Sequence, residues 1–125
     1  MPQITGSAFV GTNVAQVSPV FVFPAGTATG AGAIYSSIAR YDTVKNNFTA
    51  SVTTTGTVTG GGATATLYLS HDGINFWAAA TPQAIATTST INLTASLMVA
   101  SFACVGISAA WTGTATLQAT VAAAL

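Results

Sequence analysis

Residues 63–77, with the sequence ATATLYLSHDGINFW, carry the pattern that most constrains the fold of this chain. For the first eight of these residues small or apolar side chains alternate with Thr, Tyr and Ser, which is typical of a strand with one buried face. The alternation stops at Asp72 and Gly73, and two aromatic residues, Phe76 and Trp77, follow. Asp-Gly favours a tight turn because Gly adopts positive φ without steric cost. The stretch therefore predicts a strand, a hairpin turn at Asp72 and Gly73, and a returning strand.

Similar stretches recur along the chain between breaks rich in Gly, Asn or Pro. Residues 34–41 also fit a helical turn, but the surrounding β bias favours a strand there. Residues 97–108 are apolar on both faces, which indicates a central strand. Seven or eight short antiparallel strands with little or no helix predict an all-β sandwich or jelly roll. The expected strands lie near residues 14–23, 34–41, 48–59, 63–70, 84–88, 90–94, 97–108 and 114–121, with loops at 24–33 and 60–62.

The length of 125 residues predicts a single domain. We expect an extended arm over residues 1–13 and one sandwich domain over 14–125. The apolar residues of the arm are too few for an independent element, so the arm is expected to pair at a sheet edge or to reach a partner. The N-terminus lacks the basic and apolar regions of a signal peptide, so synthesis without export is expected.

Charge is scarce in this chain. An ordinary domain is about 25% charged, whereas this chain has four charged residues, namely Arg40, Asp42, Lys45 and Asp72. Such a surface must be hydrated by hydroxyl groups or covered by neighbouring chains, and we expect a permanent assembly. Two basic residues cannot form a patch for nucleic acid or for anionic membrane lipids. The most apolar run, residues 97–111, is shorter than a membrane-spanning helix requires.

Candidate chemistry is sparse as well. His71 and Asp72 follow Ser70, but neighbouring residues of a strand point to opposite faces, so we interpret the triplet as turn chemistry. One His, one Cys and two Asp do not provide a metal site within one chain, and the alternative is a site shared on an oligomer axis. Cys104 is expected to pack as a small hydrophobic residue. We therefore expect no enzymatic activity, no metal and no cofactor.

Aromatic residues near the expected turns suggest one further site. Phe76, Trp77 and Trp111, together with Tyr68, could form an aromatic platform for a sugar. The alternative is that these rings belong to the core.

The C-terminal half resembles the small β-sandwich modules of tailed-phage virions, such as capsid decoration (cement) proteins and fibre modules. The resemblance covers about half of the chain, and it departs from fibre modules because residues 97–108 contain no basic residue. It rests on a Thr-rich strand, a turn motif, an apolar strand at 97–108, and a Thr-Gly-Thr turn at 112–114 into a final alternating strand. The motif residues are Ser70, Asp72, Gly73, Asn75, Phe76 and Trp77.

The resemblance implies a non-enzymatic structural protein that binds the assembled capsid lattice and stabilises it. Its partner would be the major capsid protein, with a homo-oligomer in which a trimer is favoured and a dimer is the alternative. The protein would be made in the host cytoplasm and would lie on the capsid exterior. A glycan- or receptor-binding module of a phage fibre is the first alternative, and a self-assembling coat or fibre subunit is the second. The contacts are expected in the arm and in the glycine loops, at Ile4, Phe9, Val10, Gly60, Gly61 and Gly62.

Overall fold

The computed structural model describes residues 20–29 and 32–124, and these residues form strands and loops without a helix. The described part of the chain therefore offers no helix that is long and apolar enough to cross a membrane. The strands are β1 (Val20–Thr27), β2 (Ile34–Tyr35), β3 (Ala39–Thr55), β4 (Val58–Gly60), β5 (Thr64–Ser70), β6 (Trp77–Ala78), β7 (Gln83–Ala84), β8 (Ser89–Ile107), β9 (Thr112–Gly113) and β10 (Thr116–Ala124).

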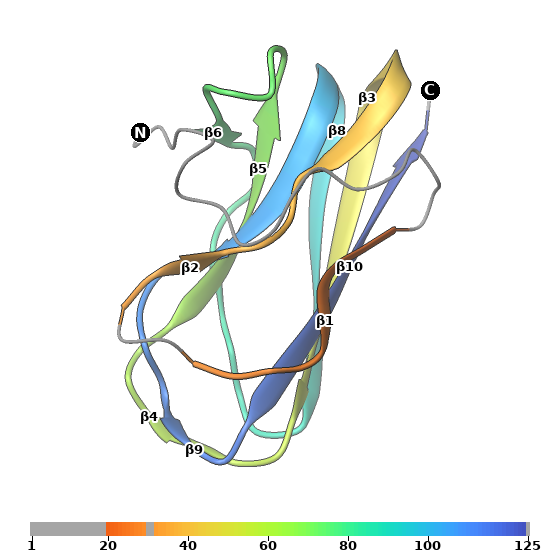
Figure 1. Ribbon diagram of the computed structural model, residues 1–125. Coiled ribbons are helices and arrows are strands. Elements are labelled where there is room, and N and C mark those ends of the chain that lie inside the picture. Colours follow the sequence, from red (N-terminus) through yellow and green to blue (C-terminus); the bar gives the residue numbers. More distant parts are fainter. Residues whose placement is uncertain (1–19, 30–31, 125) are drawn as a thin grey trace.

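Eight strands form one antiparallel sheet in the order β1-β10-β3-β8-β5-β6, with β2 also paired to β8 and β7 to β5. The two remaining strands, β4 and β9, pair with each other at the opposite end from the β5–β6 loop (Figure 1). The central position of β8, between β3 and β5, agrees with its apolar sequence. The prediction of an all-β antiparallel sandwich is confirmed.

The long strands β3 and β8 bend together and fold the sheet over onto itself. The register between them shifts twice. Four residues of β3 lie between Arg40 and Lys45, whereas one residue of β8 lies between their partners Phe102 and Ala100. The second shift lies between the pairs Lys45–Ala100 and Asn47–Ser96. Both bends lie at the upper end of Figure 1, beside the β5–β6 loop. The bent sheet encloses one core cluster with members from β1, β3, β5, β8 and β10.

The alternating strands place their small and aliphatic side chains in this core. In β10 the buried residues Leu117, Ala119 and Val121 alternate with half-buried Thr and Gln, as the sequence predicts. Under the bend, the ring of Tyr41 packs edge to face on Phe48, with ring centroids 6.1 Å apart. Burial raises the pKa of Tyr41 to about 12.

Several expected boundaries are wrong. The loop predicted at 24–33 begins later, because β1 continues through Pro24 to Thr27. Proline is tolerated there since β1 is an edge strand paired only to β10 among the described strands. The strand expected at 34–41 is divided, because residues 34–35 form β2 and the charged segment 40–45 belongs to β3. The separate strands expected at 90–94 and 97–108 are one strand, β8, with a bend between them.

Candidate interaction surface

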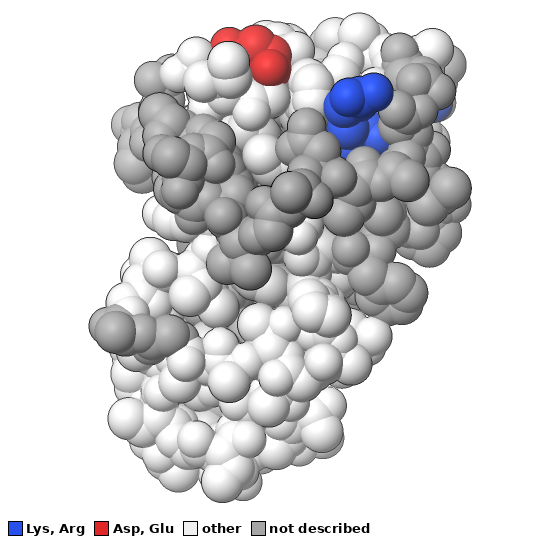
Figure 2. All heavy atoms as spheres, in the orientation of Figure 1, with Lys and Arg blue, Asp and Glu red and all other residues white. Residues whose placement is uncertain are grey.

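All four charged residues of the chain belong to two neighbouring segments. Arg40, Asp42 and Lys45 lie in the first part of β3, and Asp72 lies in the β5–β6 loop. Figure 2 shows the charged side chains on this face gathered at the upper end, while the described surface below them is uncharged. The protein therefore has one end that carries both signs of charge and an opposite end without charge.

The β5–β6 loop is closed by its own side chains. The Asp72 carboxylate accepts hydrogen bonds from the backbone N–H groups of Ile74 (2.8 Å) and Asn75 (2.9 Å) and from the Asn75 amide (3.0 Å). The Ser70 hydroxyl donates to the same carboxylate (2.9 Å) and accepts the N–H of Gly73 (2.9 Å). These hydrogen bonds stabilise the ionised carboxylate and hold the pKa of Asp72 well below its ordinary value.

This loop differs from the two-residue turn expected from Asp-Gly. Six residues separate β5 from β6, and Gly73 has a φ of +77° while Asp72 keeps a negative φ. A primed two-residue turn needs positive φ at both positions of an Asp-Gly pair. Here the Asp72 side chain caps the loop instead, so the turn depends on side-chain acceptors rather than on backbone conformation alone.

The side chains of the Ser-His-Asp triplet, residues 70–72, make their contacts within and beside this loop. The Ser70 hydroxyl is engaged with Asp72 and with the loop backbone, and the His71 ring packs on Trp77 with centroids 4.8 Å apart. Among the described residues, no group of three or more His, Cys, Asp or Glu could hold a metal, and no pocket opens on them. Cys104 is buried, and burial raises the pKa of its thiol.

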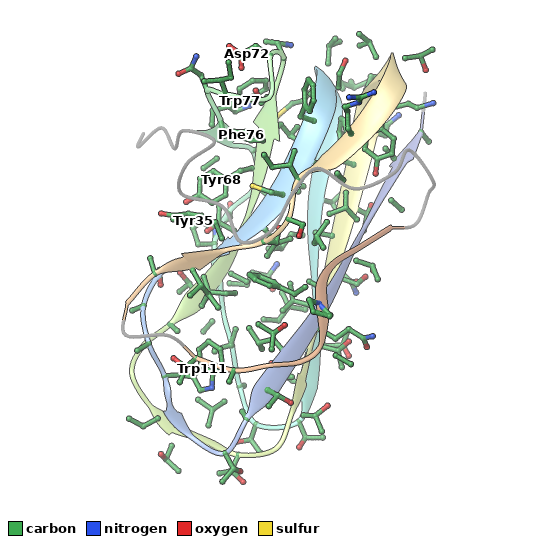
Figure 3. All side chains as sticks on the ribbon, in the orientation of Figure 1. Tyr35, Tyr68, Asp72, Phe76, Trp77 and Trp111 are labelled. Carbon is green, nitrogen blue, oxygen red and sulfur yellow. The ribbon has the colours of Figure 1, made fainter. Side chains whose placement is uncertain are left out.

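The aromatic residues proposed for a sugar platform are separated in the structure. Phe76 is fully buried against Ile38 and Cys104, and Trp111 is 2% exposed, with its Nε1 donating to the carbonyl of Ala115. Figure 3 places Phe76 and Trp77 near the β5–β6 loop and Trp111 at the opposite end. The three rings therefore do not form one exposed platform.

Tyr68, the fourth ring of the expected platform, instead pairs with Tyr35 on the outer side of β5 and β8. The rings of Tyr35 and Tyr68 meet edge to face, with centroids 6.0 Å apart, above Gly106 (Figure 3). A Cβ at Gly106 would come within 2.6 Å of Tyr68 and 2.9 Å of Tyr35, so glycine allows both rings to lie against the strand. Burial is the main cause of the raised pKa of Tyr68.

The predicted contact residues fall into two groups. Ile4, Phe9 and Val10 lie outside the described residues. Gly60, Gly61 and Gly62 are exposed; Gly60 ends β4 and the other two follow it, at the uncharged end of the molecule (Figure 1).

Sequence reasoning did not find the largest exposed aliphatic residues of the bend. Leu97 is 81% exposed, Met98 and Val99 follow it, and Val44 lies on the neighbouring strand. Lys45 and Ala100 are register partners between two register shifts, so Val44 and Val99, the residues that precede them in sequence, lie on the two strands at this bend. We call these four residues the apolar end. The signal in the sequence is the run of four apolar residues at 97–100, because a strand that alternates cannot bury successive residues on one face.

Leu97 also has an unusual backbone. Its φ of 60° is in the left-handed region, which a bulky non-glycine residue rarely adopts. The residue combines this conformation with an almost fully exposed side chain. It therefore gains little from burial in the free protein that would offset the backbone strain.

The outer side of β10, β3 and β8 forms a second surface of distinct chemistry, which we call the hydroxyl face. Its members are in register across the three strands, and pairs such as Ser51–Asn92 (2.8 Å) and Thr53–Thr90 (3.4 Å) are hydrogen-bonded. No charged residue is among them. The hydroxyl face consists of Thr49, Ser51, Thr53, Thr90, Asn92, Thr94, Thr116, Gln118 and Thr120.

Together these surfaces define a small antiparallel β-sandwich with an apolar end, a hydroxyl face and little charge. No family model matches the chain, and no curated protein matches it. Among solved structures, a structure of the infectious bursal disease virus Gx strain is similar over 98% of this chain and 31% of that chain (14% identity, TM-score 0.49). The chain thus spans about a third of the length of that viral protein.

Two smaller proteins are similar as well. The SPBc2 prophage-derived protein YomS matches 90% of this chain and all of that chain, at 11% identity and a TM-score of 0.47. A carbohydrate-binding module from Cellvibrio mixtus lichenase 5A, in complex with cellotriose, matches 97% of this chain and 95% of that chain, at 16% identity and a TM-score of 0.42. At these identities and TM-scores, none of these proteins assigns a function to this chain.

Proposed function

We propose that this protein is a non-enzymatic structural component of a virion, a decoration protein that binds the assembled capsid lattice from outside and stabilises it. The observation that carries the proposal is the scarcity of charge. Four charged residues in 125, all within two neighbouring segments, leave most of the surface without the charged coat that keeps free proteins apart.

The hydroxyl face suits permanent contact with a neighbouring subunit. Burying a charged group costs several kcal/mol unless it is paired, whereas a neutral hydroxyl needs only a hydrogen-bond partner. Ser51 and Thr53 already have such partners in Asn92 and Thr90. This face can therefore be covered by a second protein at low desolvation cost, and it is a candidate for self-association into the proposed trimer.

Stabilisation would follow from mass action. A protein that binds only the assembled lattice of the major capsid protein shifts the equilibrium away from the disassembled state. The bent sheet, packed around its main core, provides a rigid body for this purpose. The N-terminal arm and the glycine loop at residues 60–62 are further proposed contacts.

The test uses capsids of the virus whose genome encodes the chain, prepared without this protein. Adding the purified protein should give regular density on the capsid exterior by cryo-electron microscopy and should raise the temperature at which the capsids release their contents. Absence of bound protein at saturating concentration would refute the proposal. Removing residues 1–10 tests the contribution of the arm, and unchanged occupancy would exclude it.

A glycan-binding module is the alternative that the Tyr35–Tyr68 pair favours, because the two half-buried rings keep part of their surface open and aromatic rings can pack on a sugar. The burial of Phe76 and Trp111 removes two of the rings on which this function was predicted. A glycan array separates the two proposals. Specific binding of a glycan that Tyr68→Ala abolishes would favour adhesion, whereas capsid binding without glycan binding favours decoration.

A further inference from the structure

We infer that the bond between Asp72 and Gly73 is a site of spontaneous isoaspartate formation, and that the folded β5–β6 loop suppresses this modification through the Ser70 hydroxyl. The inference is independent of the proposed function, because the reaction requires only this chain and water. It concerns the one place in the sequence where glycine follows an Asp or Asn residue. Asp42 precedes Thr43, and none of the Asn residues precedes glycine.

The reaction consists of a ring closure and a hydrolysis. The backbone nitrogen of Gly73 attacks the side-chain carbonyl carbon, Cγ, of Asp72. The nitrogen loses its proton, and one carboxyl oxygen leaves as water, which closes a cyclic imide. Water then adds to the main-chain carbonyl carbon of Asp72 and breaks its bond to the Gly73 nitrogen. The chain now continues through Cγ, and the isoaspartate product has the same mass as the original residue.

An unrestrained Asp-Gly pair meets the requirements of this reaction. Gly73 has no side chain to hinder the attack by its nitrogen. Asp72 is exposed to the water that opens the imide, and Figure 3 shows it in the loop that joins β5 to β6. The unfolded chain should therefore form isoaspartate here, and any resistance of the folded protein must come from the structure of the loop.

The first restraint acts on the attacking nitrogen. The Gly73 N–H donates to the Ser70 hydroxyl (2.9 Å), and the Asp72 N–H donates to the same oxygen (3.2 Å). Closing the imide removes the Gly73 proton, so the hydrogen bond to Ser70 must be lost. Ser70 is 0% exposed. Water therefore does not readily replace its hydroxyl as the acceptor.

The second restraint acts on the carboxyl group. The Asp72 Oδ1 atom accepts the N–H groups of Ile74 (2.8 Å) and Asn75 (2.9 Å) and the Ser70 hydroxyl (2.9 Å), and its Oδ2 atom accepts the Asn75 amide (3.0 Å). A carboxyl oxygen leaves as water only after protonation. These donors favour the ionised form and hold the pKa of Asp72 well below its ordinary value. The carboxyl group is thereby kept in its unreactive form.

The third restraint is packing against Gly73. The ring of Phe102 lies so close that a Cβ at Gly73 would be 3.0 Å from it. Phe102 belongs to β8 and is the register partner of Ser70, so the ring and the hydroxyl are fixed by the same pair of strands. The Gly73 backbone is held by both contacts. The imide can therefore form only when the loop opens locally.

The test follows isoaspartate in the wild type, Ser70→Ala and Ser36→Ala, each kept folded at neutral pH. Ser36 is the matched control. Its hydroxyl is also completely buried, donates to the carbonyl of Ser37 (2.8 Å) and accepts the N–H of Val105 (2.9 Å), outside the β5–β6 loop. A further sample holds the wild type unfolded in urea.

Isoaspartate is quantified after incubation by methyl transfer from S-adenosylmethionine, catalysed by protein isoaspartate methyltransferase. Its position is assigned by electron-transfer fragmentation in a mass spectrometer, because the modification leaves the mass unchanged. Urea unfolding of each variant reports its global stability separately.

We expect the unfolded wild type to accumulate isoaspartate at Asp72 and the folded wild type to form it at least about tenfold more slowly. Folded Ser70→Ala should form it about tenfold faster than the folded wild type, which is the factor expected for losing a hydrogen bond to a charged group. Ser36→Ala should react as slowly as the wild type, even where its urea midpoint is lower.

Equal rates in the folded and the unfolded wild type would overturn the inference without the use of any variant. An unchanged rate in Ser70→Ala would exclude the role of this hydroxyl, and equal acceleration in both serine variants would assign the protection to global stability. Isoaspartate at a residue other than Asp72, or none in the unfolded chain, would exclude the site itself. None of these results depends on capsid binding, so the proposed function is tested separately.

Discussion

Thr54 offers a direct test of the packing in the core. This residue lies in β3 on the same face as Val52 and is 1% exposed. Among the residues that the structure describes, none forms a hydrogen bond with its Oγ1. A buried hydroxyl without a partner loses its hydrogen bonds to water on folding, so Thr54→Val should stabilise the protein.

The size of the effect follows from the desolvation of one hydroxyl group. Leaving such a group buried and unpaired costs about 1–3 kcal/mol. Valine has nearly the shape of threonine and a similar preference for strands, so the free energy of unfolding should rise by about 1–2 kcal/mol. With an unfolding entropy of about 2.1 cal/mol/K per residue, this corresponds to a rise in melting temperature of roughly 4–8 °C.

Thermal and urea unfolding, followed by circular dichroism, measure this change. Thr53→Val is the matched control, because Thr53 is the adjacent residue of β3 on the outer face, with its hydroxyl 3.4 Å from that of Thr90. The control should change the free energy of unfolding by no more than about 0.5 kcal/mol. If Thr54→Val is no more stable than Thr53→Val, the reasoning about the unpaired hydroxyl is refuted.

Three further predictions concern packing and pH. Gly106→Ala should destabilise the protein by about 1–3 kcal/mol, because the new Cβ would lie 2.6 Å from the Tyr68 ring, whereas Gly32→Ala faces open space and should leave the urea midpoint nearly unchanged. Equal midpoints for these two variants would contradict the packing. The pKa of Asp72 is lower in the folded protein than its ordinary value of 3.8, so its contribution to stability should be lost as the pH falls below that value. Asp72→Asn should flatten the acid side of the stability profile, and identical acid profiles would count against this. The pKa of Tyr41 is raised from 10.0 to about 12, so the unfolded state ionises first and stability should fall as the pH rises above 10.0. Tyr41→Phe should reduce that fall in equilibrium unfolding, and an unreduced slope would argue against burial as the cause.

Much of the fold could be predicted from local patterns. The alternation in β10 identified which side chains face the core, because a strand turns each successive side chain to the opposite face. In β5 it identified the buried Ala65, Leu67 and Leu69, but Thr66 and Ser70 of the other face are buried as well. The apolar composition of 97–108 indicated the central position of β8. The lengths of β3 and β8 could not be predicted in this way, because a bent strand continues through residues that break the alternation.

The candidate site likewise has features that the sequence predicted and features that it could not predict. The interpretation of the Ser-His-Asp triplet as turn chemistry came from the preference of Asp for local hydrogen bonds, and the Asp72 carboxylate accepts two backbone N–H groups of its own loop. The exposure of the aromatic residues could not be predicted, since Phe76 and Trp111 lie next to turns in the sequence yet are buried in the structure.

The sequence by itself determined the class of the protein and the chemistry of its surface. Alternating Thr and aliphatic residues specify an antiparallel β-sandwich, and four charged residues specify an unusually neutral exterior. Only the tertiary structure decided that Leu97, Met98 and Val99 project into solvent rather than fill the core. Their exposure depends on the register shifts between β3 and β8, two strands far apart in the chain. A local pattern shows which side chains alternate along one strand. It does not show where the register with a neighbouring strand shifts, or where that strand bends away from the core.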